Sequence, residues 1–513
     1  MAEWQFDMRR QPTVPPLAWV AAVRPRRVTV DCGESVRTFD GGLVEGTWVG
    51  SADPAQLPES TTVFGSGMVV RDGNLFAVPP THHLECIYYA RTSEAVAVSN
   101  SLVGLLAATG LELDPAVNYP GRFLESVRSV WMIDEPRDGR LRLRHQRFEI
   151  PTTTVPITGW FVENLLITPD LTVEASRRPR EAPFASFADY KARITAATAS
   201  LIANGAPYKP VVALSAGYDS TAVAAVVAAA APGQVSAVGF ATARPPRGST
   251  QEGDDSGAAA AAVLGMPFTT YERGAYKSRD DLAEAELLAS GMAGEDTVLL
   301  SLEPALERAM LINGYWGGPE FAFSTRDAYQ KVAPITTSGA GITEYRLRAD
   351  FAWVPLPLFG AIRTLDAPNL LDRSEMDPFR VGGHYDRPIP RRLIEEAGIK
   401  RGTFAQAKRA ATALPPRDGF TVFSPATRQS IERFVAGQQG KVAWRRRRPF
   451  SPVERAIVRT GRRLRLQRLT GALERRQTAL THFEPRLGNV LLRWAVSVVS
   501  QRYAAVRTLL DDR

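Results

Sequence analysis

The residues with the clearest potential for chemistry form the sequence SAGYDS at positions 215–220. The apolar run Val211–Leu214 before them has the length of a buried strand, and an alanine- and valine-rich run after them ends at Pro232. A strand, a short turn and a helix start create an anion site, because the first N–H groups of a helix have no intrahelical partner and carry partial positive charge. Gly217 lets a ligand approach the backbone closely. Hydroxyl donors come from Ser215, Ser220 and Thr221.

This loop resembles the SGGxDS loop of the ATP pyrophosphatases, enzymes that split ATP into AMP and pyrophosphate, with Ala216 in place of the first glycine. Within that group the chain is similar to the synthetase domain of asparagine synthetase and to its relatives, the β-lactam synthetases and lasso-peptide cyclases. The resemblance implies that the chain binds ATP and Mg²⁺. It assigns nucleotide contacts to Ser215, Gly217, Asp219, Ser220 and Thr221, and it makes Asp219 a metal ligand. An ordinary strand–turn–helix capped by a serine or an aspartate remains the alternative.

Two further loops supply candidates through the same resemblance. The sequence GYWGGPE at 314–320 is similar to the family's second pyrophosphate loop, which makes Glu320 the second expected Mg²⁺ ligand. Gly239 and Phe240 end a predicted strand at the place that lines the adenine pocket in the family. An acidic turn before a predicted helix is a weaker match, since capping of that helix is the alternative. Its members are Glu252, Asp254 and Asp255.

The expected active-site lysine lies in GIKRGTFAQAK at 398–408, which resembles the late segment where the family keeps that residue. Lys408 is the first candidate and Lys400 the second. Such a cation would offset the negative charge that develops during adenylation. A solvent-exposed lysine on a helix face is an equally good interpretation of either residue alone. Arg391 and Arg392 are candidates to bind phosphate or a substrate carboxylate.

The elements around these residues alternate between strands and helices, which predicts a parallel, doubly wound α/β sheet over 184–415. A helix begins at Ser186, in a sequence that resembles a capping box, and ends at Asn204. The other predicted elements are strands at 235–240 and 309–313 and helices at 256–264, 279–290 and 299–308. In such sheets ligands bind beyond the carboxyl ends of the strands, where both Ser215 and Gly239 are expected to lie.

Residues 1–183 instead read as strands and turns, with a hairpin signal at Arg71–Asn74 and one helix at Leu102–Thr109. They resemble the N-terminal α+β sandwich domain (Ntn-like) of the asparagine synthetase group, joined to the next domain by a linker at Arg177–Pro183. Members of that group that hydrolyse glutamine use a cysteine at the mature N-terminus as nucleophile. This chain begins with Met1, so we expect a degenerate domain without glutaminase activity.

Composition favours a soluble protein of two or three domains: the chain has 513 residues, of which 44% are hydrophobic and 23% charged. No apolar run reaches the roughly 20 residues of a membrane-spanning helix, and no secretory signal is evident. Two cysteines, Cys32 and Cys86, are too few for a disulfide framework. These features lead us to expect a cytoplasmic protein.

The tail at 416–513 reads as basic and helical. From Lys441 onward it holds 18 basic and 5 acidic residues, whereas the net charge of the whole chain is only +8. Three interpretations stay open: a helix packed on the acidic body, an amphipathic anchor at the inner face of the membrane, or a nucleic-acid contact, which is the least expected because no base-reading motif accompanies the charge.

These observations predict an ATP-dependent ligase that forms an amide bond through an acyl-adenylate and releases pyrophosphate. Its partners would be a small-molecule or peptide carboxylate and an amine. One alternative is a non-catalytic nucleotide-binding homologue that acts through partners or at the membrane surface. Another is an enzyme that modifies tRNA, which the absence of paired catalytic cysteines disfavours.

Overall fold

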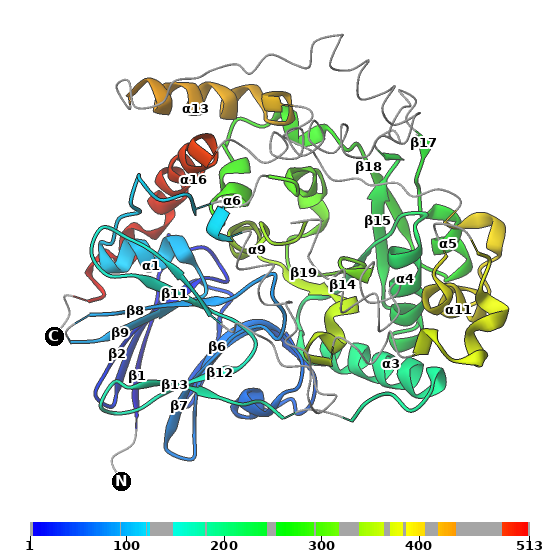
Figure 1. Cartoon of the computed structure of the whole chain (residues 1–513), viewed down its shortest axis with the longest axis horizontal. Coiled ribbons are helices and arrows are strands. Elements are labelled where there is room, and N and C mark those ends of the chain that lie inside the picture. The colour runs from blue at the N-terminus through cyan, green and yellow to red at the C-terminus, as the bar shows by residue number, and fades with distance from the viewer. Residues whose placement is uncertain are drawn as a thin grey trace, which may run out of the picture.

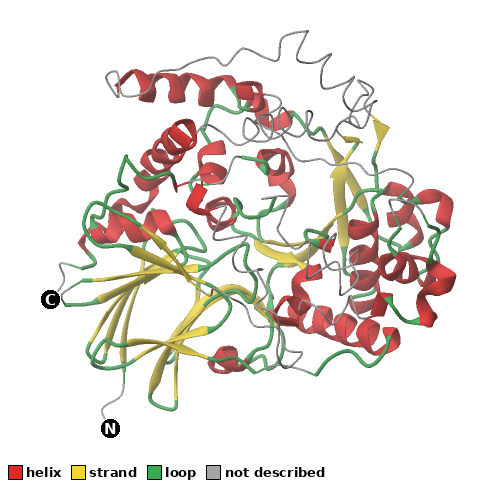
Figure 2. Ribbon diagram, in the orientation of Figure 1, coloured by secondary structure: helices red, strands yellow, loops and turns green. Residues whose placement is uncertain are grey.

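The computed structural model describes residues 4–92, 94–119, 121–123, 147–179, 182–243, 253–291, 294–317, 338–363, 370–382, 386–405, 419–437 and 485–510. Figure 1 shows the N-terminal strands on one side of the molecule and a second sheet with most of the helices on the other. Figure 2 shows the same division, with strands dominating the N-terminal side. The structure is therefore a mixed α/β fold with one parallel sheet and two largely antiparallel sheets.

The N-terminal side is a sandwich of two sheets. The first sheet has the order β1 (Gln5–Arg10), β3 (Arg27–Cys32), β2 (Trp19–Arg24), β9 (Val96–Ser99), β8 (Ile87–Arg91), β11 (Ile157–Trp160) and β10 (Arg147–Ile150). The second has the order β13 (Val173–Ser176), β12 (Asn164–Ile167), β7 (Asn74–Val78), β6 (Val63–Arg71), β5 (Gly42–Trp48) and β4 (Arg37–Phe39). Apolar side chains of both sheets form one buried cluster between them, which includes Trp19, Val30, Met68, Leu75 and Ile167.

Two local predictions for this half are confirmed. The predicted hairpin joins β6 to β7, and both Asp72 and Gly73 have positive φ, as an Asp-Gly turn between paired strands requires. The predicted helix is α1 (Leu102–Thr109). Ser101 caps its first turn by accepting a hydrogen bond from the Gly104 N–H, and Gly110 ends it in the left-handed conformation.

The second half is built on a five-stranded parallel sheet in the order β18 (Phe268–Tyr271), β15 (Ser236–Phe240), β14 (Lys209–Ala213), β19 (Ala309–Asn313) and β20 (Ala352–Pro355). The chain enters at the central strand β14, builds outward to β18, and returns to the other side of β14 with β19. The predicted strands at 235–240 and 309–313 are confirmed as β15 and β19. A small pair, β16 (Thr242–Ala243) and β17 (Gly253–Asp254), lies beyond β15.

Helices α3 (Phe187–Asn204), α4 (Tyr218–Ala230), α5 (Ala258–Val263) and α11 (Pro388–Glu396) gather beside this sheet (Figure 1). The start of α3 is as predicted, because Ser186 accepts a hydrogen bond from the Asp189 N–H. The predicted helix at 279–290 is wrong in its extent. Only η2 (Ala275–Ser278) and α6 (Glu284–Leu288) form, because Leu282 between them has a positive φ that helices exclude.

The predicted helix at 299–308 is a 3-10 helix, η3 (Thr297–Ala305), which contains Pro304. A proline supplies no N–H to an α-helical ladder, which limits the length of a regular helix here.

The predicted linker at Arg177–Pro183 is also partly wrong. Arg178 is buried, and its guanidinium donates to the carbonyl oxygens of Val162, Ser60 and Pro79, so this stretch is anchored to the sandwich. Other short elements are η1 (Pro54–Glu59), η4 (Leu356–Arg363), η5 (Ser374–Phe379), η6 (Arg401–Thr403) and η7 (Gly419–Val422).

The described parts of the tail are helical. They comprise α13 (Pro425–Gly437), α16 (Pro485–Val499) and η8 (Ser500–Thr508). The apolar residues between 489 and 510 face the body, since Val490, Trp494, Tyr503, Val506 and Leu509 are all buried. In Figure 1, α16 lies close to α1 and α6. Within the described residues, no helix is both long and apolar enough to cross a membrane.

The sandwich and the parallel sheet share a buried ionic contact made by α9 (Thr343–Ala349). Arg346 on this helix is 2% exposed, and its guanidinium donates to both carboxylate oxygens of Glu45, at 2.7 and 3.0 Å, and to Glu85. Burial alone would lower the pKa of Arg346, and the two carboxylates outweigh it and raise that pKa. Burial raises the pKa of Glu85 despite the nearby arginine.

We expect Arg346→Ala to destabilise the fold strongly, because it would leave two buried carboxylates without their cation. The free energy of unfolding should fall by about 3–5 kcal/mol, measured by urea unfolding followed by tryptophan fluorescence. Arg91→Ala is the control, since Arg91 is exposed at the end of β8, and it should change that free energy by less than about 0.5 kcal/mol. Equal effects of the two substitutions would contradict this account of the contact.

Candidate functional site

The loop at 215–220 lies where the sequence predicts it, between β14 and α4. Gly217 occupies the N-cap position of α4, and it has no side chain with which to accept hydrogen bonds from the first turn. An uncapped helix start leaves backbone donors and the positive end of the helix dipole available to an anion. The loop therefore has the backbone chemistry of a phosphate site.

The hydroxyl groups of the loop are bound mainly to the loop itself. The Oγ atoms of Ser215 and Ser220 are 2.8 Å apart, and the Ser220 Oγ also accepts from the Ser215 N–H at 3.2 Å. Thr221 donates its hydroxyl to the carbonyl oxygens of Gly217, at 2.7 Å, and Ser215, at 3.1 Å. These contacts give Ser215, Ser220 and Thr221 a role in holding the shape of the loop, in addition to any contact with a ligand.

Gly217 and Gly239, the two glycines predicted to contact nucleotide, differ in the space around their missing side chains. Among the described residues, a Cβ at Gly217 would meet only the Ser215 Oγ at 3.3 Å and the Ser220 Oγ at 3.9 Å, which leaves room that a ligand could use. A Cβ at Gly239 would lie 2.4 Å from the Leu214 carbonyl oxygen. Gly239 therefore permits the close packing of strand β15 on the loop. Phe240, the next residue, is half-buried at the end of β15.

The loop after β19 lies directly against the loop after β14. A Cβ built on Gly314 would be 2.6 Å from the carbonyl carbon of Asp219, and one on Gly317 would be 2.7 Å from the Asp219 Cβ. The structure thus brings the loops after the two strands together as far as Gly317. Glu320, the expected second metal ligand, lies outside the described residues.

A buried carboxylate that sequence reasoning did not identify holds this second loop. Asp296 is buried, and it accepts hydrogen bonds from the Tyr315 hydroxyl at 3.0 Å and from the Gly339 N–H at 2.7 Å. Burial, aided by the charge of Glu295, raises the pKa of Asp296 to about 7. Asp296 differs from other aspartates by being buried. A single aspartate before an apolar run does not indicate burial, so the sequence alone could not identify it.

A third segment, 386–405, closes over the loop. The Ala405 N–H donates to the Ala216 carbonyl oxygen at 2.6 Å, and the rings of Phe404 and Tyr218 meet edge to face with centroids 5.8 Å apart. Arg391 donates to the Tyr218 hydroxyl, whereas Arg392 pairs with Glu375 and Glu396 on the same side of α11 as the Phe187 ring. Of the two arginine candidates, Arg391 alone reaches the loop among the contacts that the structure describes.

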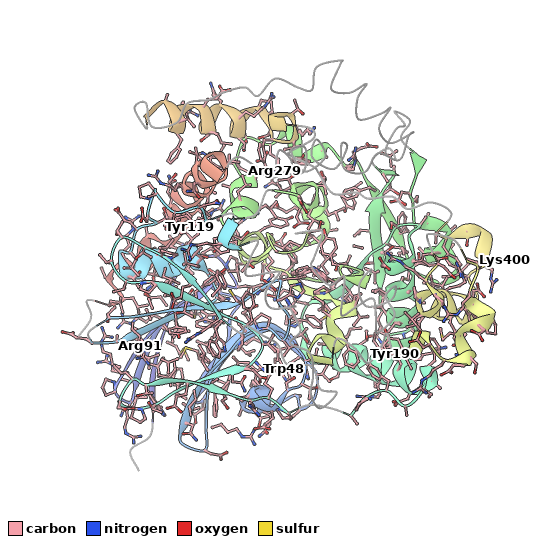
Figure 3. The ribbon with its side chains drawn as sticks, viewed as in Figure 1. Trp48, Arg91, Tyr119, Tyr190, Arg279 and Lys400 are labelled. Atoms are coloured by element: carbon pink, nitrogen blue, oxygen red, sulfur yellow. The ribbon has the colours of Figure 1, made fainter. Side chains whose placement is uncertain are left out.

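Of the two lysine candidates, the structure describes only Lys400. Lys400 is exposed, and Figure 3 shows it at the outer edge of the molecule. Lys408 lies outside the described residues, but it follows Ala405, the point at which the chain touches the loop, by three residues. The described geometry thus gives Lys400 no contact with the loop and favours Lys408 as the residue to test.

The acidic turn also reaches the loop. The carbonyl oxygen of Asp255, a buried residue, accepts from the Ala216 N–H at 3.0 Å, and Ser215 and Ser256 form an isolated β-bridge. Glu252 lies outside the described residues. Hence at least one member of this turn supports the loop through its backbone.

Asp219 itself is paired with a cation. Its Oδ1 accepts a hydrogen bond from the guanidinium of Arg387, a residue just before the two candidate arginines that the sequence reasoning did not single out. Asp219 is 27% exposed on its side chain, so it can reach a ligand from solvent. Arg387 precedes Pro388, which favours an extended backbone at Arg387, and this is the one local signal that sets it apart.

A site of this kind suits a metal bound partly by phosphate. Across the described ranges, no cluster of three or more histidine, cysteine, aspartate or glutamate side chains is suitable for a metal ion. Magnesium commonly takes only one or two protein carboxylates and completes its coordination with phosphate oxygens and water. Asp219 fits this donor set, because it is a single carboxylate at the helix start with 27% of its side chain exposed.

Comparison with known proteins adds no family. No protein-family model matches the sequence, and no curated protein matches it at a significant level.

We expect Gly317→Ala to push the two loops apart, because its Cβ would overlap the Asp219 side chain. The free energy of unfolding should fall by about 1–3 kcal/mol in urea unfolding experiments. The matched control is Gly402→Ala, where a Cβ would meet no atom of the described residues within 4 Å and stability should not fall. A silent Gly317→Ala would show that the loops do not pack as described.

Asp296 should make stability depend on pH. Its folded pKa of about 7 lies above the unfolded value of about 3.9, so the folded state binds the extra proton and loses stability as pH rises toward 7. Between pH 5 and 8, wild type should lose on the order of 3 kcal/mol relative to Asp296→Asn, measured by urea unfolding at each pH. Asp280→Asn, at an exposed position, should follow wild type. Parallel curves for wild type and Asp296→Asn would refute the assignment.

Proposed function

We propose that this protein is an ATP-dependent ligase that activates a carboxylate as an acyl-adenylate, releases pyrophosphate, and passes the acyl group to an amine. The observation that carries the proposal is the uncapped start of α4 beside Asp219, at the carboxyl end of the central strand β14. Backbone donors for phosphate and a carboxylate for a metal ion are thereby placed side by side.

The position of this loop within the sheet supports the proposal. Numbered along the chain, the parallel strands have the order 3-2-1-4-5, so the chain runs toward one edge of the sheet after β14 and toward the opposite edge after β19. A doubly wound sheet binds its ligands at such a reversal, beyond the carboxyl ends of the strands. The loops after β14 and β19 meet at this reversal, in contact through Gly314, Gly317 and Asp219. We infer the ATP-pyrophosphatase version of this architecture, preceded by an Ntn-like domain.

The residues divide the task as follows. The first turn of α4 and the hydroxyls of Ser215, Ser220 and Thr221 would bind the phosphates, and Gly217 leaves room for them. Asp219 would hold Mg²⁺, with Glu320 as the proposed second ligand. When bound, the metal ion supplies positive charge that stabilises the leaving pyrophosphate. Lys408 is the proposed cation for the adenylation step, and Phe240 is proposed to border the adenine.

The substrates are defined here only by class. The carboxylate to be activated and the amine that attacks it are small molecules or parts of a peptide. We propose that the sandwich serves as a wall of the substrate site and does not hydrolyse glutamine. The basic tail is a proposed contact with the cytoplasmic face of the membrane, limited to the part before α16, since the apolar face of α16 is buried.

The test is pyrophosphate release from Mg-ATP with a panel of carboxylates. Asp219→Asn should lower the rate at least about a hundredfold, because it removes the carboxylate proposed to hold Mg²⁺, whose positive charge would stabilise the leaving pyrophosphate. Asp280→Asn, which replaces an exposed aspartate far from the loop in sequence, should retain the wild-type rate. ATP binding without any release by wild type would favour a non-catalytic nucleotide-binding protein, and the absence of ATP binding would overturn the proposal.

A further inference from the structure

Arg387 occupies the carboxylate that the proposed function assigns to Mg²⁺. Its guanidinium pairs with the Oδ1 of Asp219, and its side chain is only 8% exposed. Arg387 stands immediately before α11, at its N-cap position, with φ −137° and ψ 83°. It is thus the cationic group that neutralises the carboxylate of the phosphate loop in the structure as described.

The backbone around Arg387 is fastened to the same loop. Arg391, one turn further along α11, donates to the Tyr218 hydroxyl, and Asp386 in turn accepts from Arg391 at 2.8 Å. At the far end of the segment, Ala405 donates to the Ala216 carbonyl oxygen. The segment therefore spans the start of α4, and a guanidinium held beside Asp219 is close to any anion bound at that helix start.

The chemistry of the two cations makes their contact with Asp219 competitive. Magnesium requires carboxylate oxygens at about 2.0–2.1 Å, and a guanidinium bound to the same oxygen stands in its way. A guanidinium presents a planar fork of donors that matches phosphate as well as carboxylate. A polyanionic phosphate offers it more negative charge than a single carboxylate does, so displacement from Asp219 toward the phosphate is favourable once the metal ion is in place.

We propose that Arg387 is a further phosphate-binding residue, which exchanges its pairing with Asp219 for the bound phosphate when Mg²⁺ takes the Asp219 oxygen. This inference rests on the proposed function.

The experiment measures binding of inorganic pyrophosphate by calorimetry across a range of Mg²⁺ concentrations, with no turnover required. Arg387→Gln should weaken pyrophosphate binding at saturating Mg²⁺ at least tenfold. The Mg²⁺ concentration that gives half of the maximal binding should fall severalfold in the same variant, because the competing guanidinium is gone. Arg387→Lys should show an intermediate loss, since it keeps the charge and loses the fork.

Arg401→Gln is the control, because Arg401 lies in the same segment but pairs with Glu395 at the surface, and it should bind as wild type does. If wild type binds pyrophosphate and Arg387→Gln binds it equally well, the inference fails and the proposed function stands. A folded Arg387→Gln protein that needs more Mg²⁺ than wild type would also overturn it, because Arg387 would then only support the loop. If wild type binds no pyrophosphate, both proposals fall.

Discussion

The buried guanidinium of Arg346 ties the two halves of the molecule together. One cation faces two buried carboxylates, Glu45 from β5 and Glu85 from the stretch before β8, so neither half could bury its charges alone. Glu45 is held further by the hydroxyl of Ser66 at 2.7 Å. The helix that carries Arg346 runs directly into β20, the edge strand of the parallel sheet. The contact of Arg346 with Glu45 and Glu85 thereby holds the edge of the parallel sheet against the sandwich.

Two other charged residues of α9, Glu344 and Arg348, also pair with residues from distant parts of the chain. Glu344 accepts hydrogen bonds from Ser101 at 2.6 Å and Tyr503 at 3.0 Å, which joins the start of α1 to η8 of the tail. Arg348 pairs with Glu286 and Glu303, in α6 and η3. The charged residues of this short helix can be buried or half-buried because each of them has a partner from a distant part of the chain.

The candidate site depends on close approach between backbones. The loop after β14 is bordered by the loop after β19, by the turn at Asp255 and by the segment that ends at Ala405, and two of these contacts are made by backbone N–H groups. Small residues at Ala216, Gly314 and Gly317 keep these distances short. Such a site offers few side chains and many backbone donors, which suits a phosphate group better than an apolar ligand.

Much of this could be predicted from the sequence because it depends on neighbours in the chain. The helix α1, the hairpin at Asp72 and Gly73, the strand β19 and the capped start of α3 follow from apolar periodicity, turn residues and caps. The same local signals placed the loop at 215–220 between a strand and a helix. They overestimated the helices at 279–290 and 299–308, where Leu282 and Pro304 interrupt regular structure.

The sequence by itself determined that the loop at 215–220 lies between a strand and an alanine-rich helix, because apolar runs and small turn residues are local signals. It left open whether a serine or an aspartate caps that helix, and the structure instead has Gly217 at the N-cap, with no side-chain hydrogen bond. Only the tertiary structure decided the partners of the charges. Arg387 lies 168 residues from Asp219, Arg346 lies 301 from Glu45, and Asp296 is unusual only because it is buried. Pairing of this kind depends on desolvation and distance in space, and neither is encoded in the local pattern of residues around each charge.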